Sequence, residues 1–205
     1  MRVTYLGHAC FLLASENFSV AIDPFCDIGY QLKRVNCDYV LCSHSHFDHN
    51  AVDCINANTI ISDNLYDNYP WLRVINSYHD NEKGTKRGRN NIFVIELDGV
   101  KICHLGDLGQ SFNKQICAEI GKIDLLLIPV GGNYTIDAKT AYEFVKEINP
   151  SAVIPMHYKT RRSNIDIDLK DHFLKLFDNI IKEKCSFELS LSSELTVYDL
   201  EDSEF

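Results

Sequence analysis

The most constraining feature of this chain is the segment at residues 43–50, which reads SHSHFDHN. In an extended segment, side chains two residues apart face the same side, so His44 and His46 can bind one metal ion together. If the chain then turns, Asp48 and His49 can face a second ion beside the first. Imidazole and carboxylate ligands together suit zinc, iron or manganese. The segment therefore predicts a metal site, whereas the alternative, a solvated histidine-rich loop, leaves the order of the four ligands unexplained.

The metal-ligand segment follows a short apolar run at residues 38–42, which is typical of a buried strand. Ligands at the end of a buried strand are held rigidly, as a catalytic metal site requires. Asp98-Gly99 separates two other apolar runs and indicates a tight hairpin turn. Strands are predicted at residues 2–6, 10–14, 19–23, 39–43, 59–62, 71–78, 91–97, 100–105, 124–130 and 151–156, with a final strand or hairpin at 187–198.

Helices are predicted from apolar residues at helical spacing over 137–148 and 169–184, with a shorter helix over 113–120. Pro150 follows the first of these and marks its end. Strands interleaved with helices indicate an α/β fold, in which two mixed β-sheets pack inside and helices lie outside. Because the chain has 205 residues and no internal repeat or linker, we expect one domain over residues 1–205.

Charge and composition narrow the classes of partner. A formal net charge of −9 argues against a nucleic-acid binder, because phosphate backbones require basic faces. No apolar run approaches the ~20 residues that span a bilayer, so no membrane span is expected. The eight cysteines form no CxxC pair and no signal peptide precedes them, so we expect buried thiols in a reduced, cytoplasmic protein. The sequence carries no signal for an oligomeric state.

Two metal ions need more ligands than residues 44–49 supply. His157 and Asp107 each lie just past an apolar strand, where a side chain can enter a cleft beside the first four ligands. Glycines on either side of the Asp107 turn permit close approach of the backbone. A carboxylate can bridge two cations, and Asp107 is the candidate for that role. A lone histidine at a strand end, such as His79, is more often a hydrogen-bonding group, but the need for further ligands favours a metal-binding role for it.

Other residues are candidates for a third ligand or for a supporting role. His79 follows the strand predicted at 71–78 and is the candidate for the remaining ligand. His104 competes with it, but its place inside a strand favours a role in orienting a ligand. His8 and Asp23, each at a strand end, are further candidates for orienting a ligating histidine.

These pieces together resemble the metallo-β-lactamase superfamily, and more closely its short single-domain metal-dependent hydrolases. The resemblance implies an αββα sandwich with a binuclear site at one edge of its two sheets. It implies that one ion is held by His44, His46 and His79, that the other is held by Asp48, His49 and His157, and that Asp107 bridges them. The matching pieces occur in order from residue 6 to residue 158: Leu6-Gly7-His8-Ala9, Ile22-Asp23-Pro24-Phe25, the 44–49 segment, Leu105-Gly106-Asp107, Ile128-Pro129-Val130-Gly131-Gly132 and Pro155-Met156-His157-Tyr158.

The resemblance also implies a hydrolytic mechanism. The superfamily includes lactonases of sugar phosphates, phospholipase D-like phosphodiesterases, thioesterases and β-lactamases. We expect two divalent cations, zinc first with manganese or iron as alternatives, to share a hydroxide that attacks a carbonyl carbon or phosphorus. Asp48 and Asp107 are the expected catalytic residues, since Asp48 both binds metal and orients the nucleophile. The predicted function is therefore hydrolysis of an ester, lactone or phosphodiester.

Basic clusters follow two of the ligands and bear on the substrate. Arg87 lies in the cluster after His79, and Arg161 and Arg162 lie in the cluster after His157. A basic rim beside a metal pair attracts a phosphate or carboxylate, so a small anionic substrate is expected. The alternative is that these are solvated loop charges. Two tyrosines are weaker candidates for hydrogen bonds to substrate, Tyr134 and Tyr158.

Two other functions remain open on the same fold. One is a di-iron redox protein, but such sites usually replace the second histidine of the first motif with Glu, and here that residue is His46. No flavin domain is expected either, and both points favour hydrolysis. The other is a non-enzymatic metal-binding module, against which the full set of ligands argues.

Overall fold

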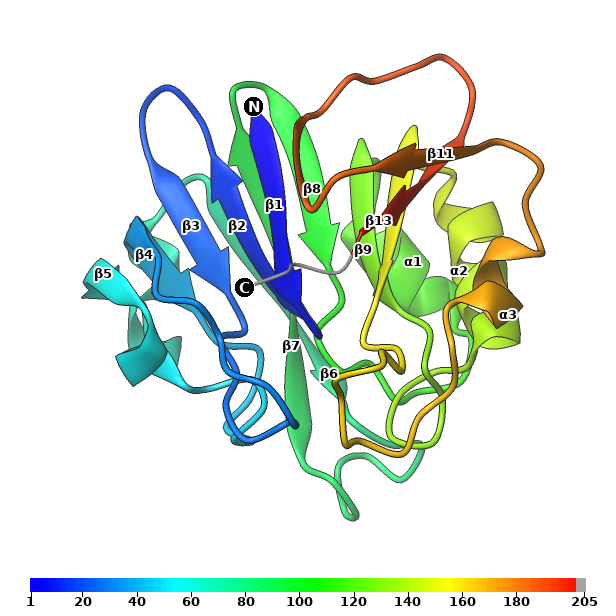
Figure 1. Ribbon diagram of the computed structural model, residues 1–205, viewed down its shortest axis with the longest axis horizontal. Coiled ribbons are helices and arrows are strands. Elements are labelled where there is room, and N and C mark those ends of the chain that lie inside the picture. Colours follow the sequence, from blue (N-terminus) through cyan, green and yellow to red (C-terminus); the bar gives the residue numbers. More distant parts are fainter. Residues whose placement is uncertain (202–205) are drawn as a thin grey trace.

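The computed structural model describes residues 1–201, except for the side chains of residues 63 and 64, as two β-sheets that pack on a shared core (Figure 1). One sheet consists of β1 (Arg2–Gly7), β2 (Cys10–Ala14), β3 (Ser19–Ile22), β4 (Asn36–Leu41), β5 (Asn56–Ile60) and β12 (Ser186–Glu188). The other consists of β6 (Leu72–Tyr78), β7 (Arg89–Leu97), β8 (Val100–His104), β9 (Leu125–Pro129), β10 (Ala152–Met156), β11 (Ile180–Glu183) and β13 (Thr196–Leu200). The strand order is β12-β1-β2-β3-β4-β5 in the six-stranded sheet and β11-β13-β10-β9-β8-β7-β6 in the seven-stranded sheet.

The alternation of side chains along each strand decides which face meets the shared core. In β3, Val20 and Ile22 point into the core between the sheets, whereas Ala21 belongs to a second apolar cluster with Phe25 and Ile28. That second cluster lies on the outer face of the six-stranded sheet, so the irregular segment after β3 covers this face. By contrast, all five residues of β9 are buried, as expected for a central parallel strand covered on both faces.

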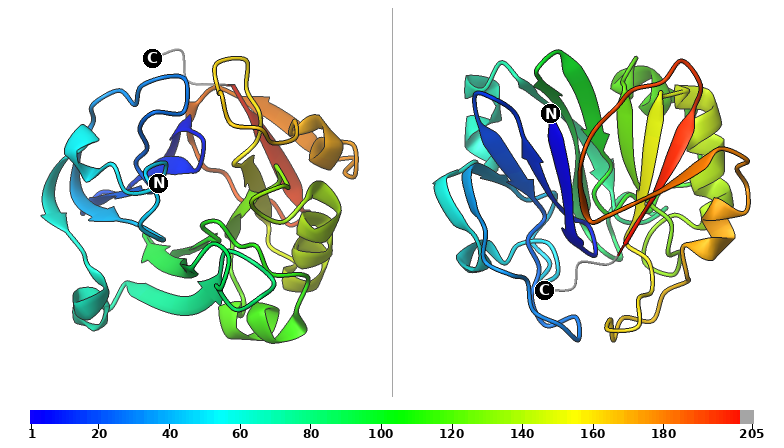
Figure 2. Two further views of the ribbon diagram at one scale, coloured as in Figure 1. Left: turned by 90° about the horizontal axis from the view of Figure 1, so that it is seen from below. Right: turned by 45° about the horizontal axis from the view of Figure 1, so that its top comes forward.

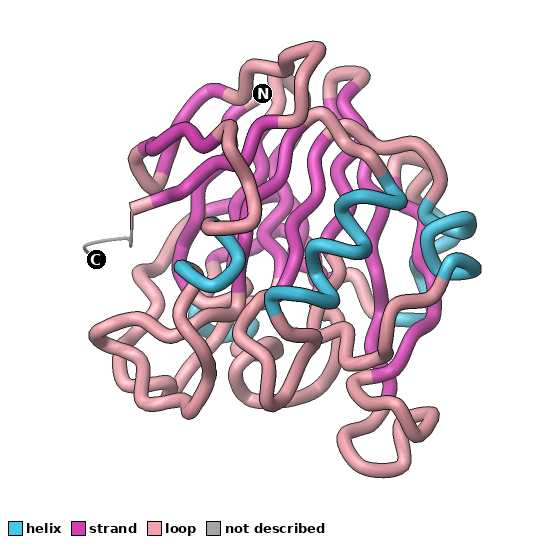
Figure 3. Tube along the Cα trace, turned by 90° about the vertical axis from the view of Figure 1, so that its right-hand side faces the viewer, coloured by secondary structure: helices cyan, strands magenta, loops and turns pink. Residues whose placement is uncertain are grey.

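The α-helices cover the outer face of the seven-stranded sheet (Figure 3). They are α1 (Lys114–Ile120), α2 (Ala138–Ile148) and α3 (Asp171–Leu174). Two short 3₁₀-helices flank β5: η1 (Val52–Cys54) precedes it, and η2 (Asp63–Asn68) follows it and packs against β6. The Asp137 side chain caps α2 by accepting a hydrogen bond from the Thr140 backbone N–H at 2.8 Å. No helix within residues 1–201 is both long and apolar enough to cross a membrane. The predicted αββα sandwich is confirmed, with helices concentrated on one side.

Two predictions for the last forty residues are wrong. The helix expected over 169–184 is reduced to the single turn of α3, and β11 occupies its second half. Of the final strand or hairpin expected over 187–198, strands form at both ends but the hairpin does not, because β12 pairs with β1 in one sheet and β13 pairs with β10 in the other. Sheet edges elsewhere in the fold accept these segments, and their pairing overrides local helical spacing.

The strand directions bring several loops to one edge of the sandwich. β3 and β4 run parallel, as do β8, β9 and β10, and β6 and β8 both run antiparallel to β7. The carboxyl ends of β3 and β8 meet at the lower edge in Figure 1. Seen from below (Figure 2, left), the loops that follow these strands surround this edge. Side chains that immediately follow these strands therefore meet there.

Candidate metal centre

Each candidate ligand immediately follows a strand that ends at the same edge. Residues 44–49 follow β4, His79 follows β6, Asp107 follows β8 and His157 follows β10. The 44–49 segment turns back on itself, because the His49 backbone N–H donates to the His46 carbonyl at 2.9 Å. The fold thus brings together the seven residues implied as ligands by the family resemblance.

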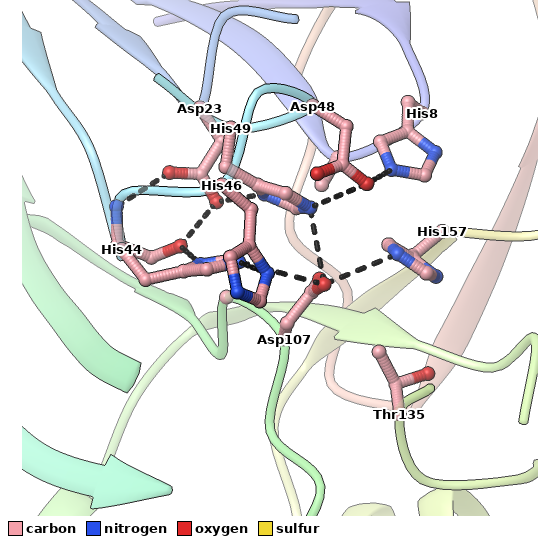
Figure 4. Close-up of polar contacts among 12 residues, drawn as sticks. His8, Asp23, His44, His46, Asp48, His49, Asp107, Thr135 and His157 are labelled. Atoms are coloured by element: carbon pink, nitrogen blue, oxygen red, sulfur yellow. Dashed lines mark hydrogen bonds and ion pairs between the residues drawn. The ribbon is translucent and has the colours of Figure 1, made fainter. Parts of the chain in front are cut away.

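The histidines converge on one oxygen of the buried Asp107 carboxylate (Figure 4). Asp107 Oδ2 lies 3.1 Å from His49 Nε2, 3.0 Å from His79 Nε2 and 3.2 Å from His157 Nε2. His44 Nε2 lies 3.8 Å from the same oxygen. Four imidazoles around one carboxylate give an acceptor-rich cavity, and such a cavity suits a cation.

Three groups of side chains have ligand atoms within 4.8 Å of one another: His44, His46 and His79; His44, His49 and Asp107; and His8, Asp48, His49 and His157. Among the described residues, Asp107 Oδ1 is buried without any hydrogen-bond partner. His44 Nε2 and His46 Nδ1 face each other at 3.1 Å, an arrangement that a shared cation satisfies. This donor set of nitrogens and carboxylate oxygens fits divalent metal ions.

Asp23 fixes the orientation of two of the histidines. Its buried carboxylate accepts hydrogen bonds from the Ser43 backbone N–H at 2.6 Å and from the Ser43 hydroxyl at 2.7 Å. It also lies 2.9 Å from His49 Nδ1. Since the Ser43 hydroxyl proton goes to Asp23, its oxygen accepts from His44 Nδ1 at 2.9 Å. Both Nδ1 atoms are therefore occupied by protons, and both Nε2 atoms face the cavity, which is the orientation that metal-binding histidines require.

Burial sets the protonation of several of these histidines. Burial, with His49 nearby, lowers the pKa of His44 to about 3. Burial also lowers the pKa of His46, and the neighbouring His79 adds to this. For Asp107, burial favours the neutral acid, but His157 and His49 outweigh it and hold the pKa well below its usual range. His44 and His46 therefore offer neutral imidazoles and Asp107 offers an ionised carboxylate, which are the forms that bind metal. At His49 the charges of Asp107 and Asp23 outweigh burial and raise the pKa well above its usual value.

The structure distinguishes His79 from His104. Both ring nitrogens of His104 are used by the backbone: Nε2 lies 2.9 Å from the Ala9 carbonyl, and Nδ1 accepts from the Gly106 N–H at 3.0 Å. His79 instead reaches Asp107, so it is the better candidate ligand. His8 lies closer to the centre than expected, because its Nε2 is 3.3 Å from Asp48 Oδ2 and it is itself a member of one ligand group.

Several site residues have left-handed backbone conformations, which non-glycine residues rarely adopt. The φ angles are +55° for His8, +51° for Asp23 and +50° for His157. Gly106, immediately before Asp107, has φ of +54°, and a side chain there would approach Ser43 Cβ to 2.7 Å. Strain of this kind gathers at functional sites, where surrounding contacts hold it in place.

Sequence reasoning missed Asn90 and did not single out Ser43. Asn90 is fully buried at the start of β7, where its side-chain oxygen accepts from the Asp107 N–H at 2.9 Å and its amide donates to the Leu105 carbonyl at 2.9 Å. Asn90 therefore fixes the turn that carries Asp107. The sequence around Asn90 gives no signal for this role. β7 runs antiparallel to β8, so its first residues, and not those that follow it, lie at the site.

A cleft of about 650 Å³ opens onto the candidate metal centre. Arg87 and Tyr134 line it, with the Arg87 guanidinium 5.2 Å from the centre of the Tyr134 ring. Tyr158, predicted to contact the substrate, lies outside the cleft lining, because its side chain is buried in the core with its ring 6.1 Å from that of Tyr5. Arg161 and Arg162 also lie outside the cleft lining, and Arg162 instead stacks on Tyr30.

The metal-free protein is expected to lose stability between pH 7 and pH 5. Burial, with His157 nearby, lowers the pKa of His8 from 6.5 to about 4. Between these values the unfolded chain binds a proton that the folded chain does not, so stability falls as the pH falls. His8 alone contributes a loss of about 2 kcal/mol at pH 5. Urea unfolding in the presence of a chelator, at pH 7 and at pH 5, measures the loss in free energy of unfolding. The His8→Gln protein should lose less stability over this range than the native sequence. Equal stability of the native sequence at the two pH values would contradict the expectation.

Comparison with known proteins places the chain in a family. The model of the β-lactamase superfamily domain matches residues 2–157. A UPF0173 metal-dependent hydrolase of Desulforamulus reducens is 32% identical, with 78% of this chain and 85% of that protein covered. The corresponding protein of Carboxydothermus hydrogenoformans is 28% identical over the same shares.

A solved structure agrees over nearly the whole chain. A Thermotoga maritima protein, described as a candidate Zn-dependent hydrolase of the metallo-β-lactamase superfamily, is 33% identical with a TM-score of 0.76. The match covers 98% of this chain and 99% of that one. The chain therefore belongs to the β-lactamase superfamily and has the metallo-β-lactamase fold.

Proposed function

We propose that the protein cleaves an ester, lactone or phosphodiester bond of a small anionic substrate at a centre of two divalent metal ions. It is a metal-dependent hydrolase of the metallo-β-lactamase superfamily. The observation that most supports a binuclear centre is that two separate ligand groups each have their ligand atoms within 4.8 Å, and Asp107 contacts members of both.

The residues divide between the two ions by position. His44, His46 and His79 would hold the first ion, and they form one of the compact groups. Asp48, His49 and His157 would hold the second, with His8 beside them, and Asp107 faces both groups. When bound, the ions supply Lewis acidity and make a water molecule nucleophilic near neutral pH.

The chain's own groups do the remaining work. Asp48 has one carboxylate oxygen against His8 and lines the cleft, so it can accept a proton from a water molecule there. Because burial is outweighed by the hydrogen bond from His8 and the charge of His49, the pKa of Asp48 lies well below its usual range. Arg87 lines the same cleft and provides a cation for an anionic substrate.

Metal analysis and hydrolysis assays test this function. Protein purified without chelator or affinity nickel is expected to carry about two zinc or manganese ions per chain by elemental mass spectrometry. The loaded protein should then cleave at least one substrate among phosphodiesters, lactones and thioesters. Two irons with a visible absorption band would instead indicate the redox function. A protein that carries no metal and takes none up on reconstitution would contradict the ligand assignment.

A further inference from the structure

A second cavity, of about 630 Å³, lies beside the cleft of the candidate metal centre. His44 and His46 line one part of it, and the loop at residues 84–89 lines another. The cavity and the cleft share two lining residues, His46 and Arg87. A ligand that occupies the second cavity therefore lies next to the centre, with Arg87 at the junction.

The two spaces differ in charge. The cleft is lined by four carboxylates, those of Asp27, Asp48, Asp107 and Asp166. The lining side chains of the second cavity that the structure describes include no Asp or Glu, although the chain has 29 of them. They include three cations instead, Lys86, Arg87 and Arg89. In a chain with a net charge of −9, a cation-lined space free of carboxylates favours an anion.

The charge in this cavity comes chiefly from the two arginines. Lys86 pairs with Glu82, which does not line the cavity. Among the described side chains, neither Arg87 nor Arg89 forms an ion pair, so their guanidinium groups can bind an oxyanion. Hydroxyl and amide groups complete the lining and add hydrogen-bond donors, among them Ser62, Asn76 and Thr85.

The loop that carries these cations is fixed by Asp80, the residue after His79. One carboxylate oxygen of Asp80 accepts from the backbone N–H groups of Glu82 at 2.7 Å and Gly84 at 2.9 Å. The other accepts from those of Lys86 at 3.0 Å and Arg87 at 2.8 Å. Four hydrogen bonds to one carboxylate tie the loop to the candidate ligand His79, so the wall of the cavity is held at a set position beside the centre.

We propose that this second cavity, here called the oxyanion pocket, binds a phosphate or carboxylate group of the substrate while the bond to be cleaved lies in the cleft. This rests on the proposed hydrolytic function. Phe47, whose side chain is 57% exposed, and Tyr134 line the cleft and leave room there for an apolar or aromatic portion. The substrate class is thus a two-part molecule, anionic at one end and apolar beyond the cleaved bond.

Matched esters test the pocket in the metal-loaded protein. Three 4-nitrophenyl esters with acyl chains of equal length, ending in methyl, carboxylate or phosphate, are compared. Arg89→Gln is expected to raise KM for the anionic esters about tenfold relative to the neutral ester, since a charge-assisted hydrogen bond is lost. Lys139→Gln, which removes one exposed positive charge on α2, should leave the ratio unchanged. Equal changes for all three esters in Arg89→Gln would overturn the proposal.

A second experiment measures anion binding without any catalytic turnover, so it tests the oxyanion pocket independently of the proposed hydrolytic activity. Crystals of the metal-loaded protein are soaked in tungstate, whose anomalous signal locates the anion. Tungstate bound between Arg87 and Arg89, and lost in Arg89→Gln, would support the pocket even if no ester is cleaved. Tungstate bound only at the metal ligands would overturn it. Failure to cleave any ester counts against the proposed function alone, because the anion position is measured independently.

Discussion

An Asp107→Ala protein is expected to lose metal and activity together. The carboxylate is buried and lies within 3.2 Å of three histidine nitrogens, so its removal deprives the centre of the one anion that faces both ligand groups. Loss of an orienting partner alone costs about 10- to 100-fold in metal affinity, and loss of a ligand should exceed this. Elemental analysis and hydrolysis of the best substrate measure the two effects.

The matched control for this experiment is Asp53→Ala, which removes an exposed carboxylate from η1. It should retain both metal and activity. An Asp107→Ala protein with its full metal content and normal turnover would remove Asp107 from the centre.

The second large effect is expected from Asp23→Asn. Three donors point at this buried carboxylate: the Ser43 N–H, the Ser43 hydroxyl and His49 Nδ1. An amide of the same shape presents its own N–H₂ group to at least one of them, so a donor meets a donor and the histidines lose their orientation. We expect metal affinity to fall about 10- to 100-fold, measured by competition with a chromophoric chelator.

The chain contains a close internal control for this substitution. Asp38, in the neighbouring strand β4, accepts from the Ser19 N–H at 2.8 Å and the Ser19 hydroxyl at 2.9 Å, which repeats the Asp23–Ser43 pair away from the centre. Asp38→Asn should therefore leave metal affinity unchanged. If it weakened metal binding as much as Asp23→Asn, the cause would be loosening of β3 and β4 and not loss of histidine orientation.

The parts of the fold that were predicted well are those with a local cause. The apolar run of β9 is one example, and the Asp98-Gly99 turn is another. At this turn the register of β7 and β8 pairs Leu97 with Val100, and both turn residues have positive φ. The segment 169–184 failed because its apolar residues fit a helix locally, while Ile180–Glu183 gains a parallel pairing with β13 that lies beyond any local window. The strands β4 and β5 begin earlier than predicted, because Asn36 and Asn56 pair with each other in polar positions.

The candidate site shows the same division. Residues 44–49, Asp107 and His157 could be chosen because chemistry-bearing side chains follow recognisable strands. The choice between His79 and His104 needed the backbone contacts of His104, and the role of Asn90 needed the antiparallel direction of β7. Tyr158 follows the same strand as His157, yet it turns into the core, and one sequence cannot give the direction of a side chain after an irregular residue.

The pairing of β1 with β12 has a consequence for how the molecule is made. Arg2 and Glu188 are partners in the register although 186 positions separate them. During synthesis, one edge of β1 therefore stays unpaired until residues 186–188 have been translated, and an unpaired edge invites association with other chains. Contacts of such long range also slow folding, because the loop must close before the pairing stabilises it. The nascent chain thus keeps this edge of β1 open to aggregation until β12 has been made and completes the six-stranded sheet.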